Sequence, residues 1–477
     1  MKGIPAALAI ALFEAAAPVQ PDPQAPWATH VPQSHRDRVY SAEQFSNTVS
    51  VTDPVDGKAL GVIRLGDSQP GNLSPLYKGQ LLVHGLGFSP DGRTLAIVSI
   101  GSNSVTFIDT ATNSVKHTTY VGRSPHEAFF TPDGKEVWVT VRGEDYVSVI
   151  DARTFEERLR LRTPNGPGMA VVSPDGRFGY VCSSFVPELV VFDVASHRRV
   201  GAVRQPSPFC PNIAVSPDGQ QVWYTLKDIG AAVVIDARPP FGQLRVIRTG
   251  PITNHVNFAR TPRGQFAYVT VGGLNAVQVY RTDTFERVAT IAVGKLPHAV
   301  WPSGDGRKIV VGLENDDQLA IIDTATNSVV ANVPVGQAPQ AIAYVANAVP
   351  SGDGLRNLQP PGAAGPTMTV LLGENQRALT SVALFDQGLT QILQAAVTGL
   401  LPRHHYQLVL TAGPGGTGDA EPIAAFTTSP AGSAVVNAVG PIRQVVRGGL
   451  VPRRYLAIRE GAGPAAGAVV QAQLERP

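Results

Sequence analysis

The sequence has 477 residues, of which 39 are lysine or arginine and 37 are aspartate or glutamate, so its formal net charge is +2. This near-balance gives no electrostatic reason to expect a nucleic acid or an anionic membrane as the main partner. Because 43% of the residues are hydrophobic, a chain of this length can bury a large core, and its length predicts more than one domain. Disorder of the whole chain is excluded.

The first 17 residues form an apolar segment with a single lysine, Lys2, and a run of small residues at its end. This order is typical of a secretory signal peptide, although Glu14 interrupts its last part. No apolar run of about 18 residues occurs elsewhere, so we expect no transmembrane span in the mature chain. The sequence therefore predicts a periplasmic or secreted protein. The alternative is the frayed N-terminus of a cytoplasmic protein.

A turn of the type Pro-Asp-Gly recurs through the middle of the chain. The residue before its glycine, Asp in all but one turn, lies at positions 91, 133, 175, 218, 263 and 305, with spacings of 42, 42, 43, 45 and 42. A second marker, an apolar run that mostly ends in Asp, closes at 109, 151, 193, 236, 281 and 323 and advances by the same steps. A period of about 40 to 45 residues is the signature of four-stranded propeller blades. The sequence therefore predicts an all-β fold built on a β-propeller.

The same pattern counts the blades. In the second unit we expect strands at 126–131, 136–142, 146–150 and 157–162. The segment 38–53 aligns with 136–151 but lacks an innermost strand before it. The orphan segment Pro339–Val345 supplies that strand, so N-terminal and C-terminal strands are expected to share one blade. They would close a seven-bladed ring over residues 36–345, which hides the strand edges.

One repeat carries an insertion. The step from Asp53 to Asp109 is 56 residues, and the excess of about 14 residues over the period falls within 66–82. Inserted loops on a repeat scaffold often mark the working face.

The second strands of several units share a motif: Trp138-Val-Thr-Val, Tyr180-Val-Cys-Ser and Tyr268-Val-Thr-Val, each after a Pro-x-Gly turn. Through this motif the chain resembles the YVTN-repeat β-propellers of bacteria and archaea, and the resemblance covers residues 36–345. The resemblance implies the fold and leaves the activity open, because similar propellers include surface-layer proteins, lactonases and the haem d1 domain of nitrite reductases. The sequence departs from haem c fused forms in having no Cys-x-x-Cys-His.

After the propeller repeats, residues 346–367 form a Pro/Gly-rich linker. Residues 368–477 follow with short strand-like runs at 368–372, 379–385, 392–397, 406–411, 423–428, 434–438 and 455–459. This density of short strands predicts a small β-sandwich domain. We expect His404 and His405 to belong to a loop there, with no metal site.

Histidines recur where the innermost strands of the blades begin. About seven residues before the Asp-Gly turns stand His84, His126 and His298, with His255 one position away and Gln340 in the shared blade. In ring order they form an arc on five adjacent blades, which should face one mouth of the central channel. These histidines could hold copper, zinc or iron, or supply an axial haem ligand. They could instead act as acid or base on an ester or lactone, or only hydrogen-bond the connections between blades.

Charged and polar residues near the histidines are candidates for contacting a ligand, although exposed turn charges are usually solvated. These candidates are Glu127, Arg142, Lys227, Glu314 and Gln340. The two cysteines, Cys182 and Cys210, should approach the same mouth and could form a disulfide in an oxidising compartment. The Asp residues that end the strands belong to turns and receive no catalytic role.

The sequence contains no Gly-x-Ser-x-Gly elbow, Walker loop or His-Glu-x-x-His. It therefore favours an exported propeller that binds a small molecule, a metal or a protein partner at the histidine-lined mouth. One alternative is a metal-dependent oxidoreductase that uses copper, zinc, iron or haem. Another is a lactonase-like hydrolase, and no catalytic residue is assigned for either.

Overall fold

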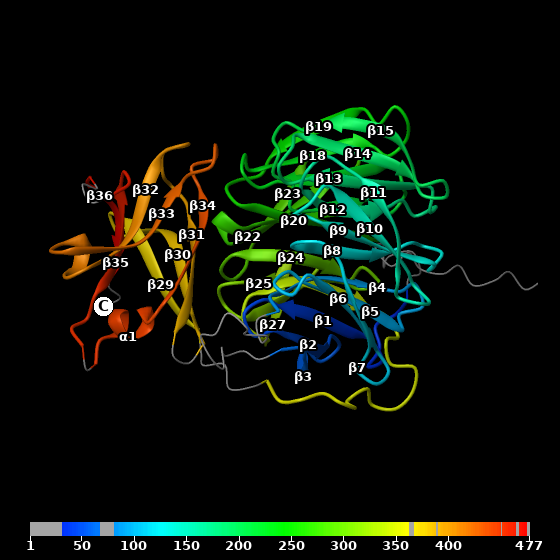
Figure 1. Cartoon of the computed structure of the whole chain (residues 1–477), viewed down its shortest axis with the longest axis horizontal. Helices are drawn as coiled ribbons and strands as arrows, with labels where there is room; N and C mark the ends of the chain where they lie inside the picture. The colour runs from blue at the N-terminus through cyan, green and yellow to red at the C-terminus, as the bar shows by residue number, and fades with distance from the viewer. Residues whose placement is uncertain are drawn as a thin grey trace, which may run out of the picture.

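The computed structural model describes residues 31–66, 81–361, 367–387, 390–449, 451–463 and 467–474. The expected signal peptide and most of the inserted loop therefore lie outside the described residues. Strands β1 to β28 form seven four-stranded antiparallel sheets, and β29 to β36 form one eight-stranded sheet. Figure 1 shows the two parts side by side. Across these described segments, no helix has the length and apolar character needed to cross a membrane.

The blades are numbered here from the first complete one. Blades 1 to 3 contain β4 (Val83–Phe88), β5 (Thr94–Ser99), β6 (Ser104–Asp109), β7 (Ser114–Tyr120), β8 (Pro125–Phe130), β9 (Glu136–Val141), β10 (Tyr146–Asp151), β11 (Glu157–Arg162), β12 (Pro167–Val172), β13 (Phe178–Ser183), β14 (Glu188–Asp193) and β15 (Arg198–Arg204). Blades 4 and 5 contain β16 (Ile213–Val215), β17 (Gln221–Leu226), β18 (Ala231–Asp236), β19 (Gln243–Arg248), β20 (Thr253–Thr261), β21 (Gly264–Val271), β22 (Ala276–Arg281) and β23 (Arg287–Ala292). Blades 6 and 7 contain β24 (Pro297–Pro302), β25 (Lys308–Leu313), β26 (Gln318–Asp323), β27 (Ser328–Pro334), β28 (Pro339–Val345), β1 (Arg38–Glu43), β2 (Thr48–Asp53) and β3 (Lys58–Arg64).

Blade 7 closes the ring as the sequence predicts. Its order is β28-β1-β2-β3, with β28 antiparallel to β1 and Tyr344 opposite Val39. The inner strands contact one another in sequence around the ring, including β24 with β28 and β28 with β4. The seven-bladed propeller is therefore confirmed.

The repeated Asp-Gly turn has a clear chemical basis. In blade 2 the Asp133 carboxylate accepts a hydrogen bond from the Thr131 hydroxyl at 2.7 Å and from the Lys135 backbone N–H at 3.1 Å. Gly134 follows with a φ of +69°, in the left-handed region that favours glycine. Each such turn joins a buried innermost strand to a second strand that is packed between neighbouring blades.

Threonines of the second strands tie each blade to the next. The Thr140 hydroxyl donates to the Gly168 carbonyl at 3.2 Å, and the Thr270 hydroxyl donates to the His298 carbonyl at 2.5 Å. In blade 3 the equivalent position is Cys182, which forms a disulfide with Cys210 just before β16. A covalent bond therefore replaces the hydrogen bond between blades 3 and 4.

Replacing both cysteines tests this inter-blade bond. The disulfide spans 28 residues, so we expect a Cys182→Ser, Cys210→Ser variant to lose roughly 3 to 4 kcal/mol in free energy of unfolding. A Cys182→Thr, Cys210→Ser variant should regain part of that loss, because threonine fills this position in other blades. Urea unfolding of the three proteins measures both effects. Equal stability of the wild type and the double serine variant would contradict the assigned role.

The linker packs against the propeller. Arg93 donates to the carbonyls of Asn347 and Ala348 at 2.9 and 3.0 Å, and Asn113 donates to the carbonyl of Gly354 at 2.9 Å. Further along, Gln359 pairs with Val62 of β3. Figure 1 shows this yellow segment running along the outside of the propeller toward the C-terminal domain.

The C-terminal domain is all-β, as expected, but its strands form one continuous sheet. The strands are β29 (Met368–Glu374), β30 (Arg377–Asp386), β31 (Gln391–Val397), β32 (His405–Thr411), β33 (Ala420–Thr427), β34 (Ala434–Gly440), β35 (Tyr455–Glu460) and β36 (Val469–Gln473), with a short helix α1 (Ile442–Arg447). Their order is β33-β32-β35-β36-β29-β30-β31-β34, and the two end strands lie close together. The sheet thus nearly closes around a core that includes Leu372, Leu393 and Leu408. Strand β36 and helix α1 were not predicted.

Candidate functional site

Each innermost strand on the histidine arc carries a β-bulge at the histidine position. Pairing of β4 with β5 passes from Val83 directly to Leu86, so His84 and its neighbour stand outside the ladder. Strands β8, β20 and β24 show the same shift at His126, His255 and His298. A bulge breaks the side-chain alternation of a strand and redirects the residue it contains.

The bulges bring the four histidine rings into one row. The ring centroids of His126 and His84 lie 4.5 Å apart, those of His84 and His298 6.3 Å, and those of His298 and His255 4.4 Å. All four side chains are buried. The structure therefore gathers residues from blades 1, 2, 5 and 6 at one mouth of the channel.

A carboxyl group stands near each half of the row. An oxygen of Glu127 lies 3.9 Å from Nδ1 of His84, and an oxygen of Glu314 lies 3.5 Å from Nδ1 of His298. Gln340 donates to Glu314 at 2.9 Å, and Gln394 of β31 also hydrogen-bonds Glu314. Gln394 was missed by the sequence analysis, since no repeat connects the C-terminal domain to the blades.

Burial decides the charge of these groups. It lowers the pKa of His84 and of His255 to about 3, and the positive charge of Lys227 adds to both effects. It also raises the pKa of Glu127 to about 8, where the one opposing contact is the backbone N–H of Leu86. At neutral pH the imidazoles are therefore neutral, which is the form that binds metal ions.

Several ligand atoms in the row have no partner within the described chain. His126 donates its Nδ1–H to the Gly168 carbonyl at 2.7 Å, which leaves a lone pair on Nε2. Nδ1 of His84 and Oε1 of Glu127 are buried without a hydrogen bond. His84, His126 and Glu127 each offer a ligand atom, and these atoms lie within 4.8 Å of one another. Their geometry suits a shared ion.

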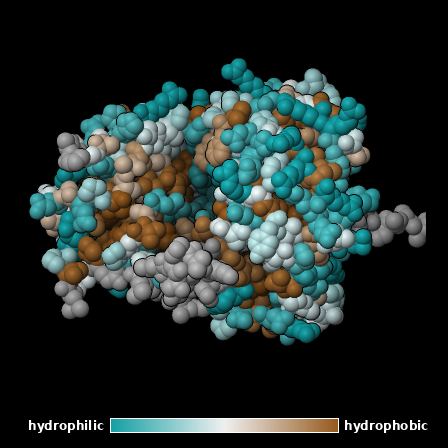
Figure 2. Space-filling model, viewed as in Figure 1, coloured by the Kyte–Doolittle hydropathy of each residue, from teal (hydrophilic) through white to brown (hydrophobic). Residues whose placement is uncertain are grey.

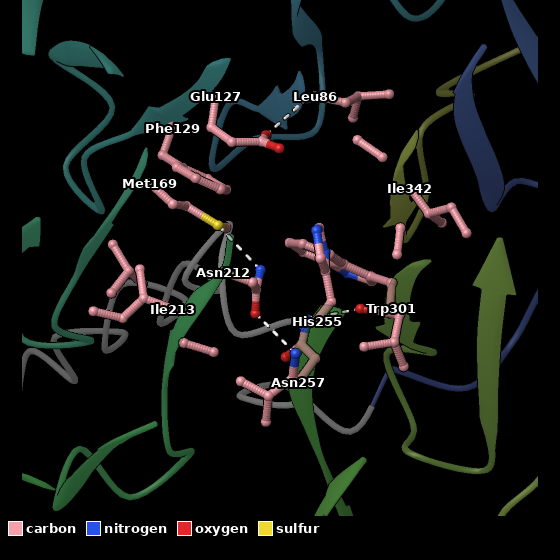
Figure 3. Close-up of a pocket in the computed structure, with 16 residues that line it drawn as sticks. Leu86, Glu127, Phe129, Met169, Asn212, Ile213, His255, Asn257, Trp301 and Ile342 are labelled. Carbon is pink, nitrogen blue, oxygen red and sulfur yellow. Dashed lines mark hydrogen bonds between the residues drawn. The ribbon is translucent and has the colours of Figure 1, made fainter. Parts of the chain in front are cut away.

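Below the mouth the channel narrows. It leaves a cavity of about 30 Å³, room for no more than a few water molecules. Apolar residues from all seven inner strands dominate its wall, including Phe129, Met169 and Trp301. Figure 3 shows these side chains around the space, with His255 reaching into it. A ligand larger than a few atoms must therefore stay at the mouth.

The C-terminal domain lies over the mouth on the side of blades 4 to 7. Asn315 donates to the Ser381 hydroxyl at 3.3 Å, and the N–H of Ala431 donates to the carbonyl of Asp228 at 3.1 Å. The rings of Phe45 and Phe385 make an edge contact with centroids 4.9 Å apart. Figure 2 shows apolar side chains gathered on the visible face of this domain, beside the propeller.

The mouth remains accessible beside blades 2 and 3. Arg142, just after β9, is half-buried between Phe185 and Phe209, with its guanidinium carbon 5.6 and 5.3 Å from their ring centroids. Phe185 is 53% exposed. Lys227, just after β17, is also half-buried. All five candidate ligand-contacting residues thus lie around the histidine row, and their roles stay predictions.

The two adjacent histidines of the C-terminal domain lie outside the histidine row. His404 lies at the surface of the C-terminal domain, 2.9 Å from a carboxylate oxygen of Glu460. His405 is the first residue of β32, so the expected loop is correct for His404 and wrong for His405.

The molecule is a seven-bladed β-propeller with a β-sheet domain over a histidine-lined mouth. No protein-family model matches the sequence, and no curated protein does either. Among solved structures, a protein of unknown function from Desulfotomaculum acetoxidans is similar with a TM-score of 0.56 and 14% identity, over 65% of this chain and 99% of that one. A hydrazine synthase chain from Kuenenia stuttgartiensis matches with a TM-score of 0.49 and 21% identity, over 58% of this chain and 90% of that one. At 14% identity, the likeness to the Desulfotomaculum acetoxidans protein shows the fold alone.

Proposed function

We propose that the protein is an exported β-propeller that binds one transition metal ion at its covered mouth, with His84, His126 and Glu127 as ligands. The observation that carries this proposal is the buried group of three ligand atoms within 4.8 Å of one another. In addition, Nδ1 of His84 and Oε1 of Glu127 are buried without a hydrogen-bond partner. Such groups are costly to bury unless something binds them.

The donor set indicates the class of metal. Two imidazole nitrogens and one carboxylate oxygen suit zinc, copper or non-haem iron, and they leave coordination positions open for a further ligand. The burial of the mouth under the C-terminal domain also limits the size of the binding partner. Because the histidines are only 5 to 6% exposed, a small ligand fits this mouth better than a folded protein does. The disulfide supports export, because such bonds persist in oxidising compartments.

Metal content tests the proposal. The full chain, purified without an affinity tag, is incubated with zinc, copper(II) or iron(II), desalted and measured by mass spectrometry. We expect about one metal ion per chain in the wild type and none in a His84→Ala, His126→Ala variant. The matched control is His404→Ala, which removes a histidine 42% exposed on the other domain.

Unfolding measurements separate loss of the site from loss of the fold. The metal should stabilise the wild type by about 2.7 kcal/mol when its free concentration is 100 times its Kd. The double variant should keep a cooperative transition and lose this gain. Absence of bound metal in the wild type, or equal binding by the double variant, would overturn the proposal.

A further inference from the structure

Two cations at the mouth have no counter-ion in contact. The guanidinium of Arg142 makes no ion pair or hydrogen bond within the described residues, and its Nε is buried without a partner. By contrast, nearby Arg123 pairs with Glu144 at 2.8 Å. The two aromatic rings on Arg142 hold the guanidinium in place and shield it from water. A shielded charge interacts more strongly with an anion than one in bulk water does.

Lys227 is the second cation. Within the described part of the chain its ammonium group forms no ion pair within 4.0 Å. Burial lowers the pKa of Lys227 from its ordinary value. The charge of Glu314 opposes this shift, and the charge of Arg142 adds to it. Both cations act on the same neighbour, since the charges of Arg142 and Lys227 each help to lower the pKa of His84.

Blade 3 lies between the blades of these two cations, and its Phe185 and the following Phe209 pack on Arg142. At the histidine position it has Gly168, and after its second strand it has Ser184. The histidine row occupies blades 5, 6, 1 and 2, so the mouth has a histidine side and a cationic side. Arg142 lies on the side where Phe185 is exposed, whereas Lys227 precedes Asp228, whose carbonyl the C-terminal domain contacts through Ala431.

We infer that a small anion, a carboxylate or an inorganic oxyanion, binds between Arg142 and Lys227 beside the metal position. The guanidinium fork matches two oxygens of such an anion, and the ammonium group supplies a further donor. The cavity of about 30 Å³ in the channel and the burial of the histidines favour a ligand of few atoms. The inference deepens the proposed function, because it names the class of ligand that would sit next to the metal.

The sum of the charges at the mouth also favours a bound anion. A divalent ion with Arg142 and Lys227 would bring four positive charges. If the ion displaces the proton of Glu127 and Glu314 is also ionised, the two carboxylates bring two negative charges. An anion on the cationic side would reduce the remaining imbalance in a poorly solvated site.

The test uses the full chain without metal, titrated calorimetrically with sodium acetate as the carboxylate and sodium sulfate as the oxyanion. Sodium chloride at equal ionic strength is the reference. We expect saturable binding of at least one probe, weakened at least about tenfold in Arg142→Gln and in Lys227→Gln. The matched control, Arg123→Gln, removes an exposed arginine already paired to Glu144 and should bind as the wild type does.

The outcomes separate the two proposals. Anion binding that survives in the His84→Ala, His126→Ala variant shows the anion site even if no metal binds. Metal binding without anion binding overturns this inference alone. If Arg142→Gln does not fold, Arg142→Lys keeps the charge but lacks the fork and should still weaken binding. The inference would be overturned if folded Arg142→Lys and Lys227→Gln both bound the anion with the affinity of the wild type.

Discussion

A chain that ends at residue 335 should fail to form a folded propeller, whereas a chain that ends at residue 361 should form one. The shorter chain lacks β28, the innermost strand of blade 7. It loses the buried Ile342, Tyr344 and Val345, each worth roughly 1.5 to 3 kcal/mol of burial. It also exposes the edge of β1 and opens the ring. Together these losses are comparable with the whole net stability of a typical domain, about 5 to 15 kcal/mol.

Circular dichroism, urea unfolding and size-exclusion chromatography distinguish the two chains. We expect a cooperative transition and a monodisperse peak only for the chain that ends at 361. That chain keeps blade 7 but lacks the C-terminal domain. It therefore also tests whether this domain shields the histidine row from solvent. Diethyl pyrocarbonate should modify the four histidines of the row faster in this chain than in the full chain. Cooperative folding of the 335-residue chain would contradict the closure described here, and unchanged histidine reactivity would contradict the cover.

The architecture was predictable because a propeller repeats its local chemistry. The Asp-Gly turns and Ile-Asp strand ends kept their period, and the orphan strand at 339–345 had a defined place in the shared blade. The histidine row was predictable for the same reason. His84, His126 and His298 occupy one register, and residues at one register of a cyclic fold meet at one end of its axis.

The remaining features depend on contacts that no repeat encodes. The β-bulges that redirect the histidines follow from strand pairing, and the sequence alone does not show which residue leaves the ladder. The position of Gln394 against Glu314 depends on how two domains pack. The disulfide between Cys182 and Cys210 was expected from the sequence as a possibility, and the structure contains it. The register gives a further reason, because Cys182 stands where Thr140 and Thr270 stand in other blades. That alignment would have placed it against the next blade.

Buried titratable groups set the last prediction, which concerns stability without metal. Burial raises the pKa of Glu43 and Glu127 from an ordinary 4.5 to about 8 and that of Asp317 from 3.8 to about 7. Burial also lowers the pKa of His84 and His255 from 6.5 to about 3. These two sets of groups act at different ends of the pH range. We expect the metal-free protein to be most stable between about pH 4.5 and 6.5.

Whether stability rises or falls with pH depends on which state, native or unfolded, binds more protons. Above pH 6.5 the histidines are neutral in both states, but the native carboxyls stay protonated up to about pH 8 while the unfolded ones are ionised. Stability therefore falls as pH rises through this range. Below pH 4.5 the carboxyls are protonated in both states, while the unfolded histidines bind protons that the native ones bind only near pH 3. Stability then falls as pH decreases.

Glu43 isolates one contribution, because its pKa is shifted by burial and by hydrogen bonds with Thr48, Ser41 and Ser50, with no histidine among the causes. It accepts from the Thr48 hydroxyl at 2.8 Å and the Ser50 N–H at 3.0 Å. Glu43→Gln keeps an acceptor for these donors and cannot ionise. Near pH 6.5 the slope of its unfolding free energy should be smaller in magnitude than that of the wild type by about 1.4 kcal/mol per pH unit, and this difference should fall to about half at pH 8. Urea unfolding at half-unit pH steps measures this slope, with Glu144→Gln as the exposed control. Parallel wild-type and Glu43→Gln profiles would show that Glu43 is already ionised in the native protein, since an ionised carboxylate contributes no slope in this range.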